Sequence, residues 1–520
     1  MTPTSRWLLS AAHKSSGKTT LAIGLAAALR TLGHSVQTFK KGPDYIDPMW
    51  LAQASGRACW NLDPHLMGWG EIDALVAREQ DGADATLVEG NKGLYDGLAL
   101  DGSNSNAALA KHLGLPVVLV IDARGMTRGV APLILGYQAF DRDLRIAGVI
   151  LNRLGGSRHE AKLRAVIEHY TDVPVLGALQ QDPALEIVER HLGLVPSQEA
   201  DAALRTIERL AEATRAQVDL ARLCALTASS APAGPAARAE PEPLRFAAPE
   251  PEPEPLSDTT ARPVRIGVAM DRAFGFYYAD DLRALREAGA ELVAIDTLHD
   301  RLLPALDGLF LGGGFPETSA AALADNSALR AALRHAIVDD QLPTYAECGG
   351  LMLLARSLRT LDGQVHPMVG AIPADVVMHP RPVGRGYVRL RPRTEAPWAA
   401  RSEAGERDRG GDSEGRNDGC VLAHEFHYSS LENLDPGAPI RWAWDVERGH
   451  GIDGQRDGLL IHRLWASYSH LRSVGRCRWA AAFVAHVRHC RDTSQPWTLE
   501  GAEPRPTADS SSPYAGVPRC

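Results

Sequence analysis

The chain has 520 residues, which is too long for one ordinary hydrophobic core and predicts two or three domains, with two the starting expectation. Its composition, 45% hydrophobic and 23% charged, is that of a globular protein and excludes a wholly disordered chain. The formal net charge of -9 gives no electrostatic reason to expect nucleic acid or an anionic membrane as a partner.

Cysteine usage and hydropathy bear on the compartment. The 7 cysteines are scattered and form no CxxC pair, which favours neither a disulfide framework nor a zinc site and indicates a reducing environment. The N-terminus lacks the pattern of a signal peptide, and no run of about 18 apolar residues is present to span a bilayer. We therefore expect a cytoplasmic protein with no membrane partner; the oligomeric state stays open, with a homodimer among the options.

The first 200 residues alternate short apolar runs with amphipathic stretches. This is the pattern of a doubly wound, mainly parallel sheet with crossover helices, so an α/β domain is predicted. Helices are expected at 18–32 and 107–113. Strands are expected at 7–10, 35–39, 85–88, 116–121, 146–151 and 175–177.

The first strand runs into AAHKSSGKTT, residues 11–20, and then into an apolar helix. In a P-loop, backbone N–H groups cradle phosphates, the lysine meets the β and γ oxygens, and the hydroxyl that follows can hold magnesium. This loop is a variant, because Ala12 stands where the full pattern has glycine. The alternative is a polar turn that only resembles a P-loop. The residues predicted to bind nucleotide are Ser15, Ser16, Gly17, Lys18, Thr19 and Thr20.

Two further strand ends carry charged residues that are expected to reach the same edge of the sheet. Doubly wound sheets bind ligands at this edge, where carboxylates can hold magnesium and orient a phosphoryl acceptor. The alternatives are surface acids in a Gly/Pro-rich turn and a helix-capping acid. The residues are Lys40, Lys41, Asp44 and Asp47 after one strand, and Glu89 and Asp96 after another.

Residues 229–263 change in composition to Ala, Pro and Glu, which is typical of a semi-extended linker. A second α/β pattern follows, with a helix at 279–288 and strands at 264–270, 291–295 and 308–311. Residues 398–419 have the composition of a surface insertion. The expected organisation is a P-loop domain at 1–200, a helix and the linker at 201–262, a second doubly wound domain at 263–492, and a flexible tail at 493–520.

A nucleophile elbow is predicted in PTYAECGGLMLL, where a strand leads into Glu347 and Cys348 and then into an apolar helix. Small glycines permit the tight turn, and the helix N-terminus stabilises a thiolate, so Cys348 is the expected nucleophile. Taken alone, a cysteine beside glycines is more often a buried small residue. The backbone N–H groups expected to face an oxyanion belong to Gly312, Gly313, Gly314 and Gly349.

The base that serves Cys348 has to be a histidine brought near by folding. Residues 457–472 offer His462 and His470, and His462 is expected to be a strand or surface residue. His424 and His427, with Glu425 between them, could be mistaken for metal ligands. Their spacing favours a β-strand instead.

The N-terminal residues resemble the cobyrinic acid a,c-diamide synthases, relatives of dethiobiotin synthetase, over nearly the whole domain. The resemblance implies ATP and Mg²⁺ as cofactors, with metal held by Thr19, Asp44 and Glu89. It also implies that Asp44, Asp47, Glu89 and Asp96 arrange metal, phosphate and an acceptor carboxylate, and that Lys40, Lys41 and Arg190 contact acidic substrate arms. The matching stretches are SSGKTT, FKKGPDYIDP, NLDPHLM, VEGNKGLYDG, LPVVLVIDARGMTRG, GVILNRLGGSRHE and ERHLGLVP.

The second domain resembles the class I glutamine amidotransferases of the cobalamin type, which have a flavodoxin-like fold. This resemblance selects His470, in ASYSH, as the base, and it implies L-glutamine as the ammonia donor. Many class I members carry glutamate two residues after the base, where this chain has Arg472. A Cys348–His470 dyad is expected to release ammonia.

Together the resemblances imply a carbon–nitrogen ligase that amidates the a and c acetate groups of the tetrapyrrole cobyrinate, or hydrogenobyrinate, through an acyl phosphate in cobalamin biosynthesis. Departures at Asn91, Lys92 and Arg472 leave one alternative, the amidation of sirohaem for dissimilatory sulfite reductase. A P-loop switch or partition ATPase, from another class, would lack the second catalytic domain. A regulatory homologue with a dead glutaminase is opposed by the presence of Cys348 and His470.

Overall fold

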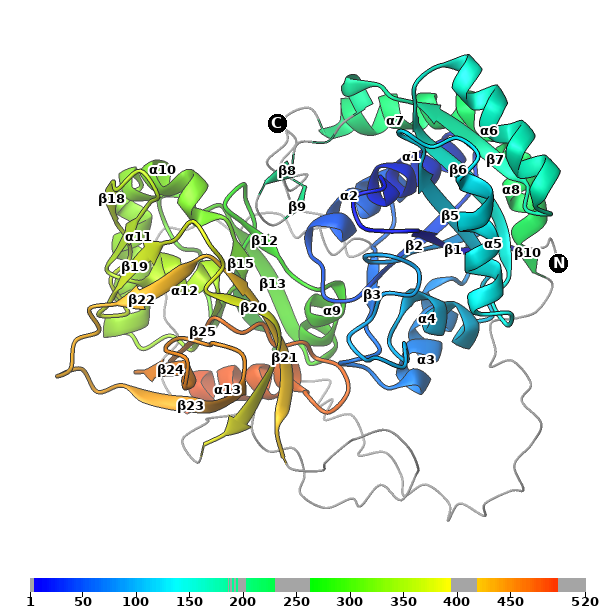
Figure 1. The fold of residues 1–520 in the computed structure, drawn as a ribbon. Coiled ribbons are helices and arrows are strands. Elements are labelled where there is room, and N and C mark those ends of the chain that lie inside the picture. Colours follow the sequence, from blue (N-terminus) through cyan, green and yellow to red (C-terminus); the bar gives the residue numbers. More distant parts are fainter. Residues whose placement is uncertain are drawn as a thin grey trace, which may run out of the picture. The chain divides into compact units, whose positions relative to one another are not determined.

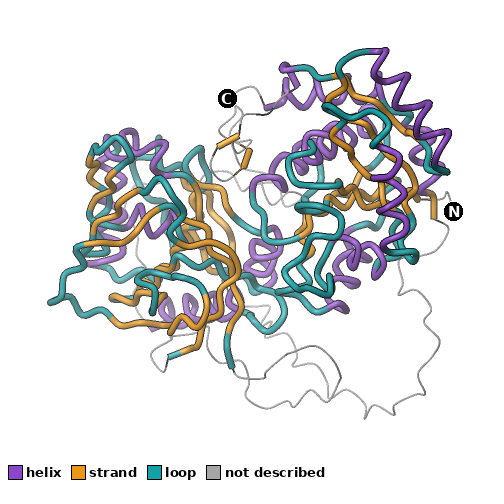
Figure 2. The backbone as a smooth tube through the Cα atoms, viewed as in Figure 1, coloured by secondary structure: helices purple, strands orange, loops and turns teal. Residues whose placement is uncertain are grey.

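The computed structural model describes residues 4–185, 187, 189–190, 193–194, 203–229, 262–393 and 419–493. The chain divides into two compact units, Met1–Ala248 and Pro249–Cys520. Strands and helices alternate in both units, which confirms the predicted α/β class (Figure 1; Figure 2). The predicted linker, surface insertion and tail lie almost entirely outside the described residues.

The sheet of the first unit has the strand order β3-β2-β4-β1-β5-β6-β7, and all neighbours in it are parallel. Central strand β1 is buried along nearly its whole length, as expected for a parallel sheet covered on both faces. The bounds are β1 (Thr4–Ala11), β2 (Val36–Lys41), β3 (Trp60–Leu62), β4 (Ala85–Glu89), β5 (Val117–Asp122), β6 (Ile146–Leu154) and β7 (Val175–Gln180).

Helices cover this sheet on both faces (Figure 1). Each helix brings the chain back so that the next strand runs parallel, and the predicted helices 18–32 and 107–113 correspond to α1 and α4. The bounds are α1 (Lys18–Thr31), α2 (Ile46–Ser55), α3 (Trp69–Glu79), α4 (Asn106–His112), α5 (Val130–Phe140) and α6 (Ser157–Tyr170).

The first unit continues beyond residue 200, into the segment that was assigned to a helix and the linker. Helices α7 (Ala203–Gln217) and α8 (Leu220–Thr227) lead to β10 (Ala228–Ser229), which pairs antiparallel with β1. Helix α7 packs closely on α1, because a Cβ added at Gly24 would lie 2.2 Å from Thr214 Oγ1. Between β7 and α7 lie a short 3-10 helix, η1 (Pro183–Leu185), and the hairpin of β8 (Glu189–Arg190) and β9 (Gly193–Leu194).

The second unit is built on a nine-stranded sheet of order β13-β11-β14-β16-β25-β24-β23-β20-β21. Its first five strands are parallel and, numbered along the chain, have the order 2-1-3-4-5 of flavodoxin-like sheets, as predicted. The other four continue it antiparallel. The bounds are β11 (Val264–Ala269), β13 (Ala290–Ile295), β14 (Gly308–Leu311), β16 (Thr344–Glu347), β20 (Gly384–Pro392), β21 (Val421–His427), β23 (Arg441–Arg448), β24 (Arg456–Ile461) and β25 (Leu464–Ser467).

Two smaller sheets complete this unit. Strands β12 (Phe274–Phe276) and β15 (Gly313–Gly314) pair antiparallel, and a four-stranded sheet has the order β18-β17-β19-β22. Its strands are β17 (Ser357–Arg359), β18 (Val365–Pro367), β19 (Asp375–Met378) and β22 (Ser429–Glu432). The helical elements are α9 (Ala279–Glu287), η2 (Pro316–Ser319), α10 (Ala320–Asp325), α11 (Ser327–Arg334), η3 (His335–Asp339), α12 (Gly349–Leu354) and α13 (Trp479–Thr493).

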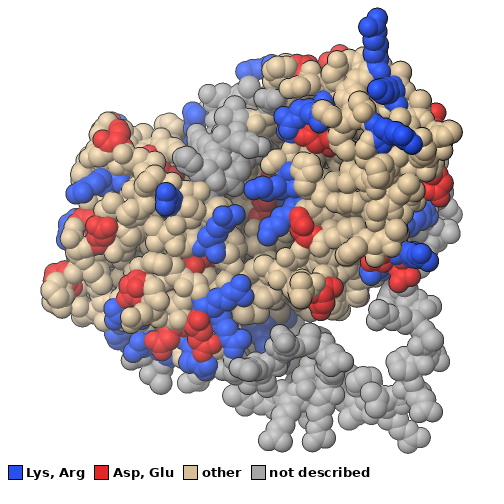
Figure 3. All heavy atoms as spheres, viewed as in Figure 1, with Lys and Arg blue, Asp and Glu red and all other residues tan. Residues whose placement is uncertain are grey.

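The surface charge and the length of the helices bear on the possible partners. Basic and acidic side chains are interspersed on the visible face of each unit (Figure 3). Among the described residues, no helix combines the length and the apolar character needed to cross a bilayer.

Candidate active sites

The predicted phosphate loop joins β1 to α1 and is held by two side chains from the end of β6. Asn152 Nδ2 donates to the carbonyl oxygen of Ser16 at 2.9 Å, and Arg153 Nη1 donates to that of Ser15 at 2.6 Å. Gly17 has φ +88°, and a Cβ there would lie 2.2 Å from Asn152 Nδ2. Glycine is therefore required at this position, both by the backbone conformation and by the approach of Asn152.

Lys18 is the first residue of α1, and its side chain is buried. Burial, and then the charge of Lys40, lowers the pKa of Lys18 to about 8, whereas Glu89, Asp47 and Asp96 act in the opposite direction. Thr19 and Thr20 follow in the first turn of the helix. The loop thus places a buried cation at a helix N-terminus, which is the arrangement that binds phosphate.

The hydroxyl of Thr19 lies among acids from two other strands. Its Oγ1 donates to Glu89 Oε1 at 2.6 Å and to Asp47 Oδ2 at 3.1 Å. Lys40 Nζ lies 3.1 Å from Glu89 Oε1 and also pairs with Asp47. Burial acts to lower the pKa of Lys40, but the carboxylates of Asp47 and Glu89 outweigh it and raise that pKa above its usual range.

Asp44 and Asp96 act mainly on the backbone. Asp44 Oδ1 accepts the N–H groups of Ile46 and Asp47, each at 3.0 Å, at the start of α2. Burial, and then the charge of Asp47, raises the pKa of Asp44 to about 7. Asp96 Oδ2 accepts the N–H of Gly93 at 2.9 Å and so shapes the loop after β4.

The donor set fits magnesium. Glu89 Oε2 is buried and has no hydrogen-bond partner in the described parts of the chain, so one carboxylate oxygen beside Thr19 is available. Burial raises the pKa of Glu89, which a bound cation would reverse. No group of three or more His, Cys, Asp or Glu among the described residues could hold a metal by itself. Magnesium in P-loop proteins needs fewer protein ligands, because phosphates and waters supply the rest.

The residues expected to contact an acidic substrate are only partly described. Lys41 Nζ donates to Asn91 Oδ1 at 3.3 Å, and burial lowers the pKa of Lys41 to about 8. Arg190 lies in β8, but its side chain is outside the described part. Strands β2 and β4 are neighbours in the sheet, and Lys41 at the end of β2 contacts Asn91 in the loop after β4. The two strand ends therefore lie side by side, as predicted.

Two residues without a recognisable sequence motif fix the loops around the predicted nucleotide site. Asn106 Nδ2 donates to the carbonyl oxygens of Asn91, at 2.5 Å, and Gly93, at 2.9 Å. Asp122, at the end of β5, pairs with Arg124 and Arg153; burial acts to raise its pKa, but hydrogen bonds led by those of Arg124 lower it to about 2. The only signal in the sequence was that Asp122 follows an apolar strand.

In the second unit, Cys348 stands between β16 and α12 with φ 47° and ψ −99°. A non-glycine residue rarely adopts a positive φ, and this one marks the predicted elbow. The N–H of Cys348 donates to the carbonyl oxygen of Ser467 at 2.7 Å. A Cβ added at Gly350 would lie 2.1 Å from the carbonyl oxygen of Leu311. The turn is thus fixed from β25 on one side and needs glycine against β14 on the other.

The structure brings His470 to Cys348. The imidazole is buried, is hydrogen-bonded to Cys348, and has Nδ1 3.3 Å from Glu347 Oε2. Burial acts to lower the pKa of His470, but Cys348 and Glu347 outweigh it and raise the pKa to about 10. The buried contacts of this ring therefore favour its protonated form.

The predicted oxyanion glycines divide into two kinds. The N–H of Gly312 donates to the hydroxyl of Tyr277 at 3.0 Å, so it is already used inside the protein. A Cβ at Gly313 would lie 2.7 Å from His470 Cε1, and one at Gly349 would lie 2.8 Å from the nitrogen of Gly314. Gly313, Gly314 and Gly349 thus surround the cysteine and the histidine.

The other three histidines that the sequence offered lie in a turn and on a strand. His462 is exposed in the turn between β24 and β25, as expected. His424 and His427 lie on β21, which confirms the predicted strand. Glu425, between them, accepts the N–H groups of His450 and Gly451 at 2.7 and 2.8 Å.

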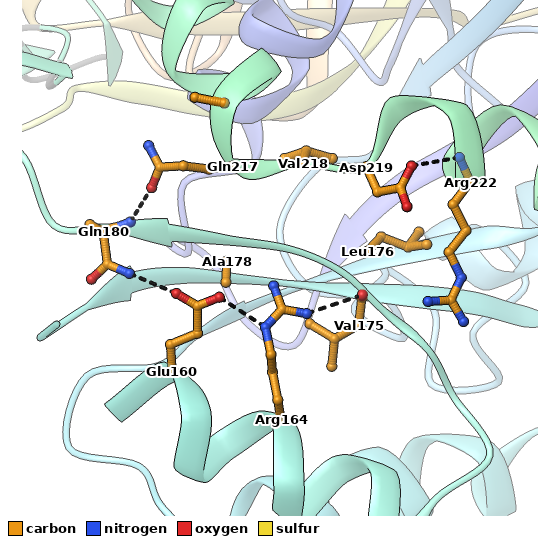
Figure 4. A pocket seen from close by; sticks show the side chains of 11 residues that line it. Glu160, Arg164, Val175, Leu176, Ala178, Gln180, Gln217, Val218, Asp219 and Arg222 are labelled. Atoms are coloured by element: carbon orange, nitrogen blue, oxygen red, sulfur yellow. Dashed lines mark hydrogen bonds and ion pairs between the residues drawn. The ribbon is translucent and has the colours of Figure 1, made fainter. Parts of the chain in front are cut away.

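A separate cavity of about 630 Å³ lies in the first unit beside β7, α6 and the segment that joins α7 to α8 (Figure 4). Several of its polar groups are paired with one another: Glu160 with Arg164 at 2.8 Å, and Gln180 Nε2 with Glu160 Oε2 at 3.0 Å. The cavity is lined by none of the candidate site residues.

Together the folds and sites define a glutamine amidotransferase unit joined to a P-loop nucleotide-binding unit. Residues 11–195 match the CobQ/CobB/MinD/ParA nucleotide binding domain, and residues 265–476 match the CobB/CobQ-like glutamine amidotransferase domain. The second match opposes a P-loop switch or partition ATPase, which would lack that domain.

Proteins named cobyrinate a,c-diamide synthase are similar over nearly the full chain. The one from Magnetococcus marinus is 41% identical over 94% of this chain and 99% of its own. The one from Methanosarcina acetivorans is 38% identical over 94% and 97%. A hydrogenobyrinate a,c-diamide synthase from Thermobifida fusca is 40% identical over 93% and 96%. The chain belongs to the cobyrinate a,c-diamide synthase family.

Proposed function

We propose that this enzyme amidates the a and c acetate carboxylates of cobyrinate, using ATP and L-glutamine. The observation that carries the proposal is the presence in one chain of two buried reactive sets, Lys18 and Thr19 with Glu89, and Cys348 with His470. The first set suits phosphoryl transfer and the second suits the release of ammonia from an amide. Relatives named cobyrinate a,c-diamide synthase support the choice of acceptor.

In the glutaminase site, the Cys348 sulfur attacks the side-chain amide carbon of glutamine and forms a thioester. His470 takes the thiol proton and returns it to the leaving nitrogen, which departs as ammonia. Gly313, Gly314 and Gly349 are the candidate sources of N–H groups for the oxyanion, since the Gly312 amide is engaged by Tyr277. The thioester is then hydrolysed to glutamate.

In the synthetase site, the phosphate loop and Lys18 hold the triphosphate. Thr19 and Glu89 would hold Mg²⁺, which would neutralise charge on the phosphate oxygens. Asp47 also accepts from Thr19, and Asp44, the other expected metal ligand, accepts backbone N–H groups at the start of α2. An acetate carboxylate of the substrate receives the γ-phosphoryl group and becomes an acyl phosphate, and ammonia displaces phosphate to give the carboxamide. Activation is needed because a carboxylate at neutral pH does not react with ammonia.

Lys41 and Arg190 are the proposed contacts for acidic arms of the macrocycle, whereas Lys40, also expected there, is already paired with Asp47 and Glu89. Lys41 faces Asn91, in the loop that also carries Lys92, and this loop is where the sequence departs from the expected pattern. Because this loop is expected to contact the substrate, sirohaem is the competing acceptor.

The test is to incubate the purified chain with Mg-ATP, glutamine and either cobyrinate or sirohaem, and to follow the products by mass spectrometry. We expect cobyrinate to lose about one mass unit for each carboxyl converted to carboxamide, and to do so twice. Conversion of sirohaem alone would overturn the choice of acceptor, and conversion of neither would overturn the proposed function.

A further inference from the structure

The residue before the nucleophile, Glu347, is buried at the end of β16 and uses its two oxygens differently. Oε1 accepts the N–H of Leu471 at 2.9 Å and the hydroxyl of Tyr345 at 2.6 Å. Oε2 lies 3.3 Å from Nδ1 of His470. One carboxylate therefore holds the backbone just after the histidine and also faces its ring.

The position two residues after His470 cannot supply this carboxylate. Arg472 stands there, 1% exposed, and its Nε and Nη2 lie 2.9 and 2.6 Å from Asp280 Oδ2 on α9. Its guanidinium carbon lies 4.9 Å from the centre of the Tyr278 ring. Arg472 thus joins the segment after β25 to α9, and the acid facing the imidazole comes from the strand that leads into the nucleophile.

The charges around His470 are consistent with this arrangement. From β21, His424 approaches through its backbone, and burial lowers the pKa of its side chain to about 3, so it is neutral. From the elbow come the Cys348 side chain and the carboxyl group of Glu347, whose Oε2 lies 3.3 Å from Nδ1 of His470. An imidazolium at His470 thus has a carboxylate on one side and a thiolate on the other.

We propose that Glu347 is a positioning residue for the glutaminase reaction, fixing the ring of His470 and stabilising its protonated form. This rests on the proposed function. The proton of the Cys348 thiol moves to Nε2, the ring nitrogen away from Glu347, leaving a thiolate that bonds to the amide carbon of glutamine. The same proton leaves on nitrogen when the carbon–nitrogen bond breaks. Water then gives a proton to His470 while its oxygen attacks the thioester, and that proton returns to sulfur as the carbon–sulfur bond breaks.

The test compares Glu347→Gln with Glu425→Gln in the full chain. Glutamine at 347 keeps an oxygen for the N–H of Leu471 but removes the charge beside His470. Glu425 is a matched control, because it is also buried in this unit and its carboxylate also accepts backbone N–H groups, two where Glu347 accepts one. We expect Glu347→Gln to lower kcat for glutamine hydrolysis about 10- to 1000-fold and to change its pH profile, with a smaller change in KM.

Two further measurements separate positioning from folding. Ammonia-driven amidation should be retained in Glu347→Gln, and alkylation of Cys348 by iodoacetamide at neutral pH, followed by peptide mass spectrometry, should slow. The role of Glu347 is overturned if Glu347→Gln hydrolyses glutamine within twofold of the wild type with the same pH profile, or if Glu425→Gln changes the profile equally. If the wild-type chain does not hydrolyse glutamine, the proposed function fails first and the role of Glu347 fails with it.

Discussion

The backbones of His424 and His470 are bonded to each other in both directions. The N–H of His424 donates to the carbonyl oxygen of His470 at 3.2 Å, and the N–H of His470 donates to that of His424 at 2.7 Å. The pKa values of their imidazoles are nevertheless shifted in opposite directions. Burial, and then the charge of His470, lowers the pKa of His424 to about 3, whereas Cys348 and Glu347 overcome burial and raise that of His470 to about 10. The surroundings thus favour the neutral form of the His424 ring and the protonated form of the His470 ring.

Because the pKa of His424 is lowered, we expect this residue to reduce the unfolding free energy of the protein in mild acid. A histidine in the unfolded chain has a pKa of about 6.5. Because the pKa of His424 is lower in the folded protein, its contribution is complete above about pH 6.5 and is lost as the pH falls towards 3. Between pH 7 and 5 the wild type should lose about 2 kcal/mol of unfolding free energy through this residue. In His424→Gln that loss should be absent, as measured by urea unfolding at each pH.

His462→Gln is the matched control, because His462 is exposed in a turn of the same unit. Its unfolding free energy should follow the wild-type pH dependence. Equal slopes for all three proteins would show that His424 is not held neutral.

Replacing the nucleophile should separate the two half-reactions. Cys348→Ser should lower glutamine-dependent amidation by at least about 10³-fold, because the hydroxyl of serine is a much weaker nucleophile than a thiolate. Amidation driven by added ammonium should be retained, since the residues around Lys18 are untouched. Product formation with each nitrogen source, followed by mass spectrometry, measures both. Cys224→Ser, in α8 of the first unit, should leave both rates unchanged, and loss of the ammonium-driven rate in Cys348→Ser would contradict the division of labour.

The sequence predicted those parts of the fold whose signal is local. The strand at residues 7–10 begins with three consecutive apolar residues, and the elbow at Cys348 has its glycines beside it in the chain. Helix α7 was expected as a helix, but an amphipathic pattern does not say which sheet it covers, so residues 203–229 were not assigned to the first unit.

The contacts that complete the sites depend on the register of the sheets. Glu347 and Leu471 are 124 residues apart, and they meet because β16 and β25 pair with Glu347 opposite Ser467. Arg153 reaches Ser15 across 138 residues in the same way, from the far end of β6. Neither pair has a sequence pattern of its own, so the contacts of Glu347 and Arg153 could not be predicted from the sequence.

The glycine at the start of α1 should be less replaceable than the one at its end. Gly17 and Gly33 have similar positive φ values, +88° and +91°, but a Cβ at Gly17 would meet Asn152 at 2.2 Å, and one at Gly33 would meet nothing within 4 Å. Gly33→Ala should cost about 1–2 kcal/mol of stability from backbone strain alone. Gly17→Ala should cost more and should also weaken ATP binding at least about tenfold, because Asn152 holds the phosphate loop. Isothermal titration calorimetry and thermal unfolding test this; equal effects of the two substitutions would contradict it.

Adjacent lysines on β2 provide the last comparison, because both are buried but only one is paired with acids. Lys40 contacts Glu89 and Asp47, whereas Lys41 donates to the neutral Asn91. Lys40→Met should therefore lower the unfolding free energy of the first unit by about 3–5 kcal/mol, because it leaves buried carboxylates without a cation. Lys41→Met removes one neutral partner and should cost about 1 kcal/mol.

Since Glu89 is also the proposed magnesium ligand, added Mg²⁺ should recover part of the loss in Lys40→Met and none in Lys41→Met. Urea unfolding with and without Mg²⁺ measures both effects, and the same loss in the two variants would mean that the acids around Thr19 do not depend on Lys40.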